Sequence, residues 1–218
     1  MNIVKETSKL KKAQLVVSTF DLSNRKYDKN LWENFLTPMI AEIESTTTLE
    51  DILDNKRIKK TKLFYKGLGL DPSRHRPSSD SLLRRIVKGQ GLYQINALVD
   101  LNNYLSLKLH LPIGSYDLSK LNDDLSYLVA SKGEEYEGIG KGIIRISNFP
   151  VLSDSLGPFG SPISDSTRAM ISLETKKAML VVYSFDESPS GLQAIKSEVE
   201  QAINGIFGTT EIQTTIVV

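Results

Sequence analysis

Residues 95–120 read INALVDLNNYLSLKLHLPIGSYDLSK, and this stretch marks the change from a helical to a strand-rich part of the chain. Its leucines recur at helical spacing, at Leu98, Leu101, Leu105 and Leu109. Pro112 and Gly114 then end the predicted helix. Helical patterns dominate before this stretch, and short apolar runs between turn residues follow it. This order predicts an α+β domain.

The same periodicities predict the other elements. Apolar residues at helical spacing indicate helices over residues 31–43, 49–53, 82–87 and 191–206. β-Branched and apolar runs indicate strands over residues 13–20, 125–131, 142–147, 151–153, 170–173, 179–185 and 211–217. A serine hydroxyl of residues 78–79 is expected to cap the helix over residues 82–87. The segment GIGKG at residues 138–142 lacks the spacing of a phosphate loop and predicts a hairpin turn.

Length and composition bound the architecture and the chemistry. With 218 residues and 40% hydrophobic content, the chain can close one sizeable core. We expect residues 1–60 to form a helical N-terminal extension packed on a domain of residues 61–218. The absence of cysteine and the presence of only His75 and His110 predict no metal site and no cofactor. No run of 18 apolar residues and no signal-peptide pattern occur, so we expect a cytoplasmic protein without membrane association.

Polar residues at the start of the helix that carries Leu98 to Leu109 are the first candidates for a functional site. At helical spacing Asn96, Asp100 and Asn103 share one face. Asparagine is a poor helix former unless its amide caps a helix end, makes a hydrogen bond or binds something. One interpretation is that these side chains only satisfy backbone amides. The other is that Asn102 and Asn103 form the polar wall of a pocket.

Two blocks of residues resemble a known family. The first contains, in order, Asn96, Val99, Asp100, Asn103, Tyr104, Pro112, Asp117 and Lys120. It resembles the pattern N-x-V-D-x-T-N-Y-x-x-x-x-x-G-Q-P-L-H-A-F-D-x-x-K of the B3/B4 editing domain in the phenylalanyl-tRNA synthetase beta subunit. The second block, SLGPFG at residues 155–160 with SDST at 164–167 and LE at 173–174, resembles that domain's G-x-M-G, Ser/Thr-rich and L-E segments. The resemblance covers roughly residues 74–185.

The resemblance implies a fold, an activity and a set of site residues. The fold is a B3/B4-like domain of packed β-layers flanked by helices. The activity is hydrolysis of an ester that joins the wrong amino acid, tyrosine, to phenylalanine tRNA, through a water positioned by polar groups. Asn102 and Asn103 are implied as catalytic residues. The implied substrate-binding residues are Glu174, acting as a buried acceptor, together with Gly114, Ser115, Gly157 and Gly160.

The chain departs from the family pattern at Gly114, where the synthetases commonly have a histidine. A side chain that could donate a hydrogen bond or move a proton is therefore missing. Ser115 and Tyr116 are the candidates to substitute for it. His110 lies four residues earlier, on the preceding helix, and is not assigned this role.

Basic residues are concentrated in one segment. Residues 56–88 contain eleven Lys or Arg and two Asp, a net charge of +9 within a chain of net charge +1. This strip either forms a solvated face that pairs with acidic residues or contacts the phosphates of a nucleic acid. For the second case the predicted RNA-binding residues are Arg74, Arg76, Arg84, Arg85 and Lys88.

Three functions follow from these patterns. The first is an aminoacyl-tRNA deacylase that acts in trans, with tRNA as its partner. The second is an RNA- or tRNA-binding module without catalysis. The third is an enzyme or sensor for a free amino acid or another small molecule. A complete aminoacyl-tRNA synthetase is not expected, because an anticodon-binding domain and an aminoacylation partner do not fit within 218 residues. The oligomeric state stays open.

Overall fold

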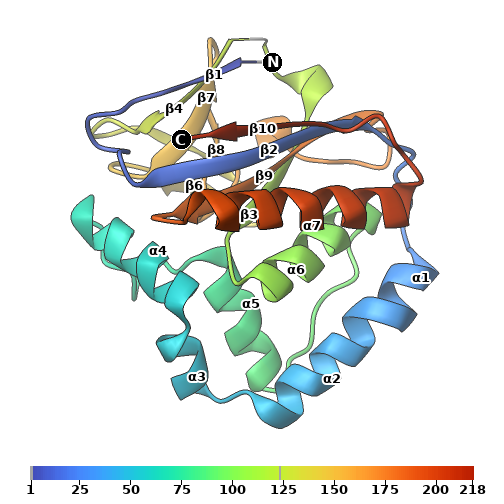
Figure 1. Cartoon of the computed structure of the whole chain (residues 1–218). Helices are drawn as coiled ribbons and strands as arrows, with labels where there is room; N and C mark the ends of the chain where they lie inside the picture. Colours follow the sequence, from blue (N-terminus) through green and yellow to red (C-terminus); the bar gives the residue numbers. More distant parts are fainter. Residues whose placement is uncertain (1, 123) are drawn as a thin grey trace.

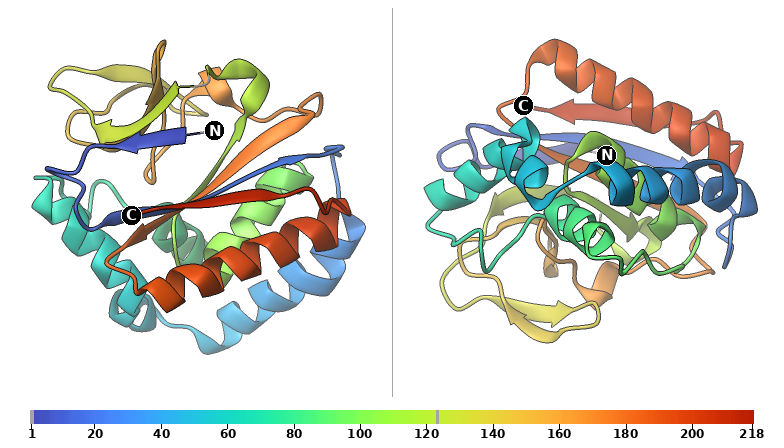
Figure 2. Two further views of the ribbon diagram at one scale, coloured as in Figure 1. Left: turned by 45° about the horizontal axis from the view of Figure 1, so that its top comes forward. Right: turned by 90° about the horizontal axis from the view of Figure 1, so that it is seen from below.

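A computed structural model describes residues 2–122 and 124–218, and it stacks one helical layer and two sheets (Figure 1). The middle layer is a four-stranded antiparallel sheet in the order β10-β2-β9-β3. Its strands are β2 (Ala13–Asp21), β3 (Ile113–Asp117), β9 (Lys177–Phe185) and β10 (Gln213–Val217). Helices cover one face of this sheet, and the second sheet covers the other (Figure 2). The expected α+β fold of packed β-layers and flanking helices is confirmed.

The sequence of strand β9 is an almost continuous apolar run, because the strand is buried on both faces of the middle sheet. Leu180 and Val182 point to the helical side, whereas Val181 and Tyr183 point to the second sheet. Because successive side chains of a strand alternate between faces, a strand buried on both faces needs apolar residues at every position. Two hydrophobic cores therefore lie back to back across one sheet.

The second sheet has the order β1-β4-β7-β8. Its strands are β1 (Asn2–Lys5), β4 (Asp124–Val129), β7 (Pro150–Asp154) and β8 (Gly157–Gly160), with β1 parallel to β4 and the other pairs antiparallel. A separate hairpin consists of β5 (Glu135–Gly138) and β6 (Gly142–Arg145). Gly140 and Gly142 have φ angles of +67° and +65°, which confirms the predicted hairpin turn.

The helical layer begins with α1 (Lys29–Leu31), a π-helical turn (Trp32–Leu36) and α2 (Thr37–Thr46). It continues with α3 (Leu49–Asp54), α4 (Lys56–Gly67), α5 (Ser78–Val87), α6 (Ala97–Leu109) and the long α7 (Pro189–Phe207). Short 3₁₀ turns lie at Leu118–Lys120 and Thr167–Ala169. Each predicted helix is present, because each presents an apolar face to the middle sheet or to a neighbouring helix.

Helix α6 begins with a cap that its sequence predicts. The Asn96 side chain accepts a hydrogen bond from the Val99 amide at 3.1 Å. Asp100 accepts bonds from Trp32 Nε1 at 2.8 Å and from the Ile95 amide at 3.0 Å. The helix ends at His110, which has a left-handed φ of 54°. Asn96 and Asp100 thus serve the backbone and the core, as the structural interpretation expected.

Two local predictions are wrong. Residues 170–173 form a loop and turn, because this segment leads from the 3₁₀ turn to β9 and pairs with no strand. No serine caps α5: its cap position is Pro77, and Asp80 provides the negative charge in the first turn.

Residues 1–60 provide β1 and β2 as well as helices, and β2 lies inside the middle sheet. The boundary at residue 60 stays a prediction.

Candidate functional site

A cavity of about 290 Å³ lies where α6 meets the edge strand β3. The polar side chains that line it are Asn96, Asn102 and Asn103 of α6 and its cap, Ser115 of β3 and Asp165 of the loop after β8. Isoleucine, valine and methionine side chains complete the walls, including Ile139 from the β5-β6 turn. This volume is close to the lower end of small-molecule pockets, about 300 Å³. The cavity therefore suits a group of the size of one aminoacyl moiety.

Asn102 and Ser115 form one side of this cavity. The amide nitrogen of Asn102 donates to Ser115 Oγ at 2.7 Å, and the Asn102 residue is only 9% exposed. Its amide oxygen is buried and has no hydrogen-bond partner among residues 2–122 and 124–218. A buried acceptor without a partner costs free energy unless something binds it. Because the Ser115 oxygen accepts from Asn102, the hydroxyl proton of Ser115 is free to be donated into the cavity.

Asp165 forms the opposing acidic side. Its Oδ1 accepts hydrogen bonds from the Tyr116 hydroxyl at 2.8 Å and from the Ser161 amide at 3.1 Å. Both bonds go to one oxygen, so the other oxygen is open to the cavity that Asp165 lines. Burial raises the pKa of Asp165 from its ordinary value near 4 to about 6, although these two bonds act in the opposite direction. A carboxyl group with this pKa can take and return a proton near neutral pH.

Two buried tyrosines, Tyr116 and Tyr183, form a chain of hydrogen bonds that ends at Asp165. The hydroxyls of Tyr116 and Tyr183 are 2.6 Å apart. Burial raises the pKa of both phenols well above the ordinary value, so both keep their protons. Since Tyr116 donates to Asp165, Tyr183 is left to donate to Tyr116, and the three groups form a chain that fixes the carboxylate.

The Tyr116 hydroxyl also gives a steric reason for two glycines. A Cβ atom on Gly114 would lie 2.3 Å from that hydroxyl, and so would a Cβ atom on Gly160. Tyr116 is fully buried and hydrogen-bonded, so its ring cannot move aside cheaply. The space that a histidine at position 114 would need is therefore filled by Tyr116 in this chain.

Comparison with known proteins identifies the family. The model of the B3/4 domain matches residues 60–201, well over half of the chain. The chain belongs to the B3/4 domain family. The phenylalanine–tRNA ligase beta subunit of Fusobacterium nucleatum is 27% identical over 178 residues, which are 78% of this chain and 21% of that protein. The same subunit of Legionella pneumophila is 30% identical over 78 residues, or 35% of this chain and 10% of that protein.

This B3/4 domain thus spans about a fifth of the length of the Fusobacterium relative and less of the other. Among solved structures, an N-terminal fragment of the phenylalanyl-tRNA synthetase beta subunit from Pyrococcus horikoshii aligns with 98% of this chain and 49% of its own. The sequence identity is 15% and the TM-score is 0.48.

The B3/4 fold brings only part of the predicted site together. Asn102, Asn103 and Ser115 line the cavity, and Gly114 and Gly160 lie against Tyr116 behind it. Glu174 is exposed on the turn before β9 and is not among the residues that line this cavity, and the predicted buried acceptor is therefore not formed there. Gly157 lies at the start of β8, where its carbonyl accepts a hydrogen bond from Arg168 at 2.9 Å. The roles of these residues stay predictions.

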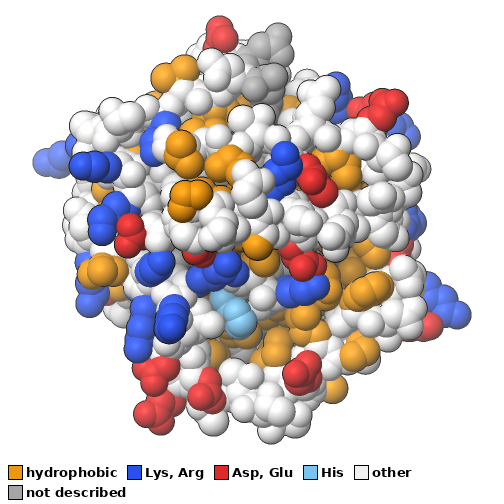
Figure 3. All heavy atoms as spheres, viewed as in Figure 1, with side chains coloured by type: hydrophobic (Ala, Val, Ile, Leu, Met, Phe, Trp, Pro, Cys, Tyr) orange, Lys and Arg blue, Asp and Glu red, His pale blue; other side chains and the backbone are white. Residues whose placement is uncertain are grey.

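The basic strip of this B3/4 domain is divided between two kinds of residue. Arg84 and Lys62 contact the fully buried Asp80 at 2.7 and 2.8 Å, and Arg57 pairs with Glu187 at 3.1 Å. Arg85 stacks over the Tyr93 ring at 4.1 Å. By contrast, Arg74, Arg76 and Lys88 are exposed. Figure 3 shows Lys and Arg side chains gathered over the part of this face where α4 lies.

Asp165 is the residue that sequence reasoning missed. It lies within the SDST segment at residues 164–167, which served only as part of a Ser/Thr-rich match. The one local signal was an acid within an otherwise uncharged loop, GPFGSPISDST.

Among the described residues, no group of three His, Asp or Glu is placed to hold a metal ion. Within residues 2–122 and 124–218, no helix has the length and apolar character needed to cross a membrane.

Proposed function

We propose that this B3/4 domain hydrolyses an aminoacyl ester, with aminoacyl-tRNA as its substrate, in the cavity between α6 and β3. The observation that carries the proposal is the meeting of three groups in one small cavity: the carboxylate of Asp165, the unpaired amide oxygen of Asn102 and the hydroxyl of Ser115. The similarity to phenylalanine–tRNA ligase beta subunits supports tRNA as the source of the ester.

Asp165 is the proposed general base. Its free oxygen accepts a proton from a water molecule as that water forms a bond to the ester carbonyl carbon. The tetrahedral intermediate then breaks the bond to the ribose oxygen, and Asp165 returns its proton to that oxygen. The products are a free amino acid and a tRNA with a free terminal hydroxyl.

Asn102 and Ser115 bind the parts of the substrate that change or carry charge. The Ser115 hydroxyl donates to the carbonyl oxygen, where negative charge develops in the intermediate. The amide oxygen of Asn102, which is buried and unpaired, accepts from the α-ammonium group of the aminoacyl moiety once the side chain turns toward the substrate. Asn103, one residue farther along α6, orients the same moiety.

A panel of aminoacyl-tRNAs tests the proposal, including tyrosine mischarged on phenylalanine tRNA. We expect release of the amino acid from at least one species, and a loss of about 100-fold or more in Asp165→Asn, the usual contribution of a general base. Asp54→Asn is the matched control, because Asp54 is exposed on α3 and pairs with Lys59 on the surface. Release no faster than in buffer for every species contradicts the proposal.

A second candidate function is tRNA binding without hydrolysis. The exposed side chains of Arg74, Arg76 and Lys88 favour it, because the fold leaves them available to phosphates. This function predicts salt-sensitive binding of uncharged tRNA that is unchanged in Asp165→Asn, together with no release of amino acid from any species.

A further inference from the structure

A second hollow lies on the side of α4 that faces solvent. It is a groove of about 230 Å³ between α4, residues 9–12 before β2, and the end of β9. Apolar residues form its floor, Leu63, Phe64, Leu68 and Phe185. Lysines form its rim, Lys9, Lys11, Lys12 and Lys60. Only Lys60 of these four belongs to the basic strip of residues 56–88, so the rim is assembled by the fold.

The floor is accessible at Leu63, which is exposed, and at the half-buried Phe64, whereas Phe185 is buried. Phe64 stacks on Phe185, with ring centroids 4.5 Å apart and an angle of 27° between the rings. Leu63 lies beside them on α4 and is 68% exposed. An exposed leucine surrounded by lysines gains nothing from folding, because its surface stays in water. It gains from burial only when a flat or apolar group covers the groove.

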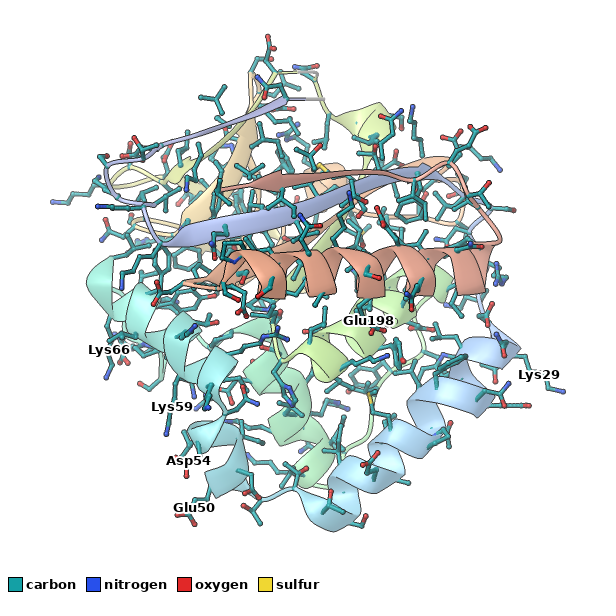
Figure 4. The ribbon with its side chains drawn as sticks, in the orientation of Figure 1. Lys29, Glu50, Asp54, Lys59, Lys66 and Glu198 are labelled. Atoms are coloured by element: carbon teal, nitrogen blue, oxygen red, sulfur yellow. The ribbon has the colours of Figure 1, made fainter. Side chains whose placement is uncertain are left out.

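The rim carries more positive than negative charge. Asp186 is the acid that lines the groove, and its carboxylate is 3.6 Å from Lys12 Nζ. Lys60 donates to the backbone oxygen of Asp186, so this lysine keeps its charge uncompensated. Lys9 and Lys11 are exposed and form no ion pair in the described part of the chain. Lys59 and Lys66 also project from α4, on the opposite side of the view from Lys29 (Figure 4).

We propose that this groove binds a nucleotide, with the base on the Leu63 and Phe64 floor and the phosphate among Lys9, Lys11 and Lys12. An apolar or aromatic platform beside several lysines is the combination by which proteins hold single-stranded nucleic acid. The half-buried ring of Phe64, which Phe185 supports by stacking, favours a planar base over an aliphatic chain. The nucleotide is part of an RNA strand, which presents base and phosphate together, and a free nucleotide is the alternative that the test distinguishes.

The inference deepens the proposed function, since it names the surface that holds the RNA, but it rests on no step of the hydrolysis. Helix α4 also contacts the loop that leads to Asp165: its buried Tyr65 hydroxyl donates to the Pro162 carbonyl at 3.3 Å. An RNA bound along the solvent side of α4 would thus lie across one helix from the loop that positions the proposed base.

Fluorescence anisotropy with a labelled uridine octanucleotide tests the inference, with unlabelled AMP as competitor. Lys9→Glu/Lys11→Glu should weaken binding by roughly tenfold or more at low salt and reduce the slope of log Kd against log salt by about 1.4 for two lost phosphate contacts. Lys26→Glu/Lys29→Glu makes the same charge change near α1 and should alter Kd by less than about twofold. Leu63→Ser should weaken binding about fivefold with an unchanged salt slope, because it removes apolar contact and no charge.

Each outcome decides the inference. Tight octanucleotide binding with weak AMP competition supports the inference, whereas equal affinities for the octanucleotide and AMP overturn it in favour of a free nucleotide. Equal losses in the two charge-reversed variants, or no effect of Leu63→Ser, overturn the inference. Binding of anionic lipid vesicles in place of either nucleotide ligand overturns it too. Because the octanucleotide carries no aminoacyl ester, a failure here is distinct from a failure to hydrolyse aminoacyl-tRNA.

Discussion

The cavity beside α6 and the groove beside α4 have similar volumes, about 290 and 230 Å³, but opposite chemical character. In the cavity, the carboxylate of Asp165 is held by Tyr116 and a backbone amide, and the Asn102 amide donates to the Ser115 hydroxyl. The groove holds flexible lysines around an exposed apolar floor. Fixed polar groups suit a reaction that needs precise geometry, whereas mobile cations suit attachment of a charged strand. The comparison assigns chemistry to the first region and binding to the second.

The largest effect should come from the base of the cavity and should depend on pH. The free oxygen of Asp165 must be ionised to accept a proton, so the hydrolysis rate of the unmodified chain should fall about tenfold per pH unit below its pKa of about 6. Asp165→Asn should lower the rate by about 100-fold or more at pH 7 and remove this dependence. Rates of amino-acid release between pH 4.5 and 8 measure both. A variant with the same profile as the unmodified chain would place the chemistry elsewhere.

The next largest effect concerns the close packing behind the cavity. Gly114→Ala places a methyl group 2.3 Å from the Tyr116 hydroxyl, which must move and lose its bond to Asp165. We expect a loss of about 3 kcal/mol in the free energy of unfolding, the upper range for overpacking. Gly205→Ala is the control: it lies within α7 with no atom near the new methyl group, and it should stabilise by up to about 1 kcal/mol. Urea unfolding of both variants gives the two values, and equal values contradict the steric explanation.

A stability change of opposite sign should accompany the loss of activity in Asp165→Asn. The folded-state pKa of Asp165 is raised, so the folded chain binds this proton more tightly than the unfolded chain does. The unmodified chain therefore loses stability as the pH rises from about 4 to about 6. Asparagine avoids the burial of charge, and we expect the variant to be more stable by about 2 kcal/mol at pH 7, with little difference at pH 4. Chemical denaturation at both pH values tests this, and a variant that is less stable at pH 7 contradicts it.

The smallest effect compares two arginines of the basic strip: Arg84, which pairs with the buried Asp80, and Arg74, which is exposed. Arg84→Gln leaves the fully buried Asp80 with Lys62 as its remaining ion-pair partner and should cost about 1 to 2 kcal/mol of stability. Arg74→Gln changes an exposed side chain and should stay within about 0.5 kcal/mol. Thermal unfolding at matched salt compares them. Equal stabilities would mean that Arg84 is available to RNA after all.

Sequence alone predicted the parts of this molecule that depend on local periodicity. Helix α6 and its cap follow from the spacing of its leucines and from Asn96, and Asn102 reaches the cavity because of its position on that helix. The strand over residues 179–185 follows from its apolar run and lies within β9. Neighbouring residues decide these features, so one stretch of sequence contains most of the information.

The missed parts depend on contacts between distant segments. Asp165 becomes a candidate base only when Tyr116, 49 positions away, folds back over Gly114 to meet it. Glu174 is exposed because the segment before β9 turns instead of forming a strand. The lysines of the groove come from the segment before β2 and from α4, and they meet Phe185 of β9. Local charge counts favoured residues 56–88 instead, and part of that charge serves the buried Asp80.

A crystal structure with a non-hydrolysable tyrosyl-adenosine, in which an amide replaces the ester, tests the division between the two regions most directly. The account predicts that the aminoacyl moiety occupies the cavity between α6 and β3, with its carbonyl carbon facing the free oxygen of Asp165 and its ammonium group on the Asn102 amide oxygen. An aminoacyl moiety bound in the lysine-rimmed groove, or at the exposed turn that carries Glu174 with the cavity empty, would contradict it.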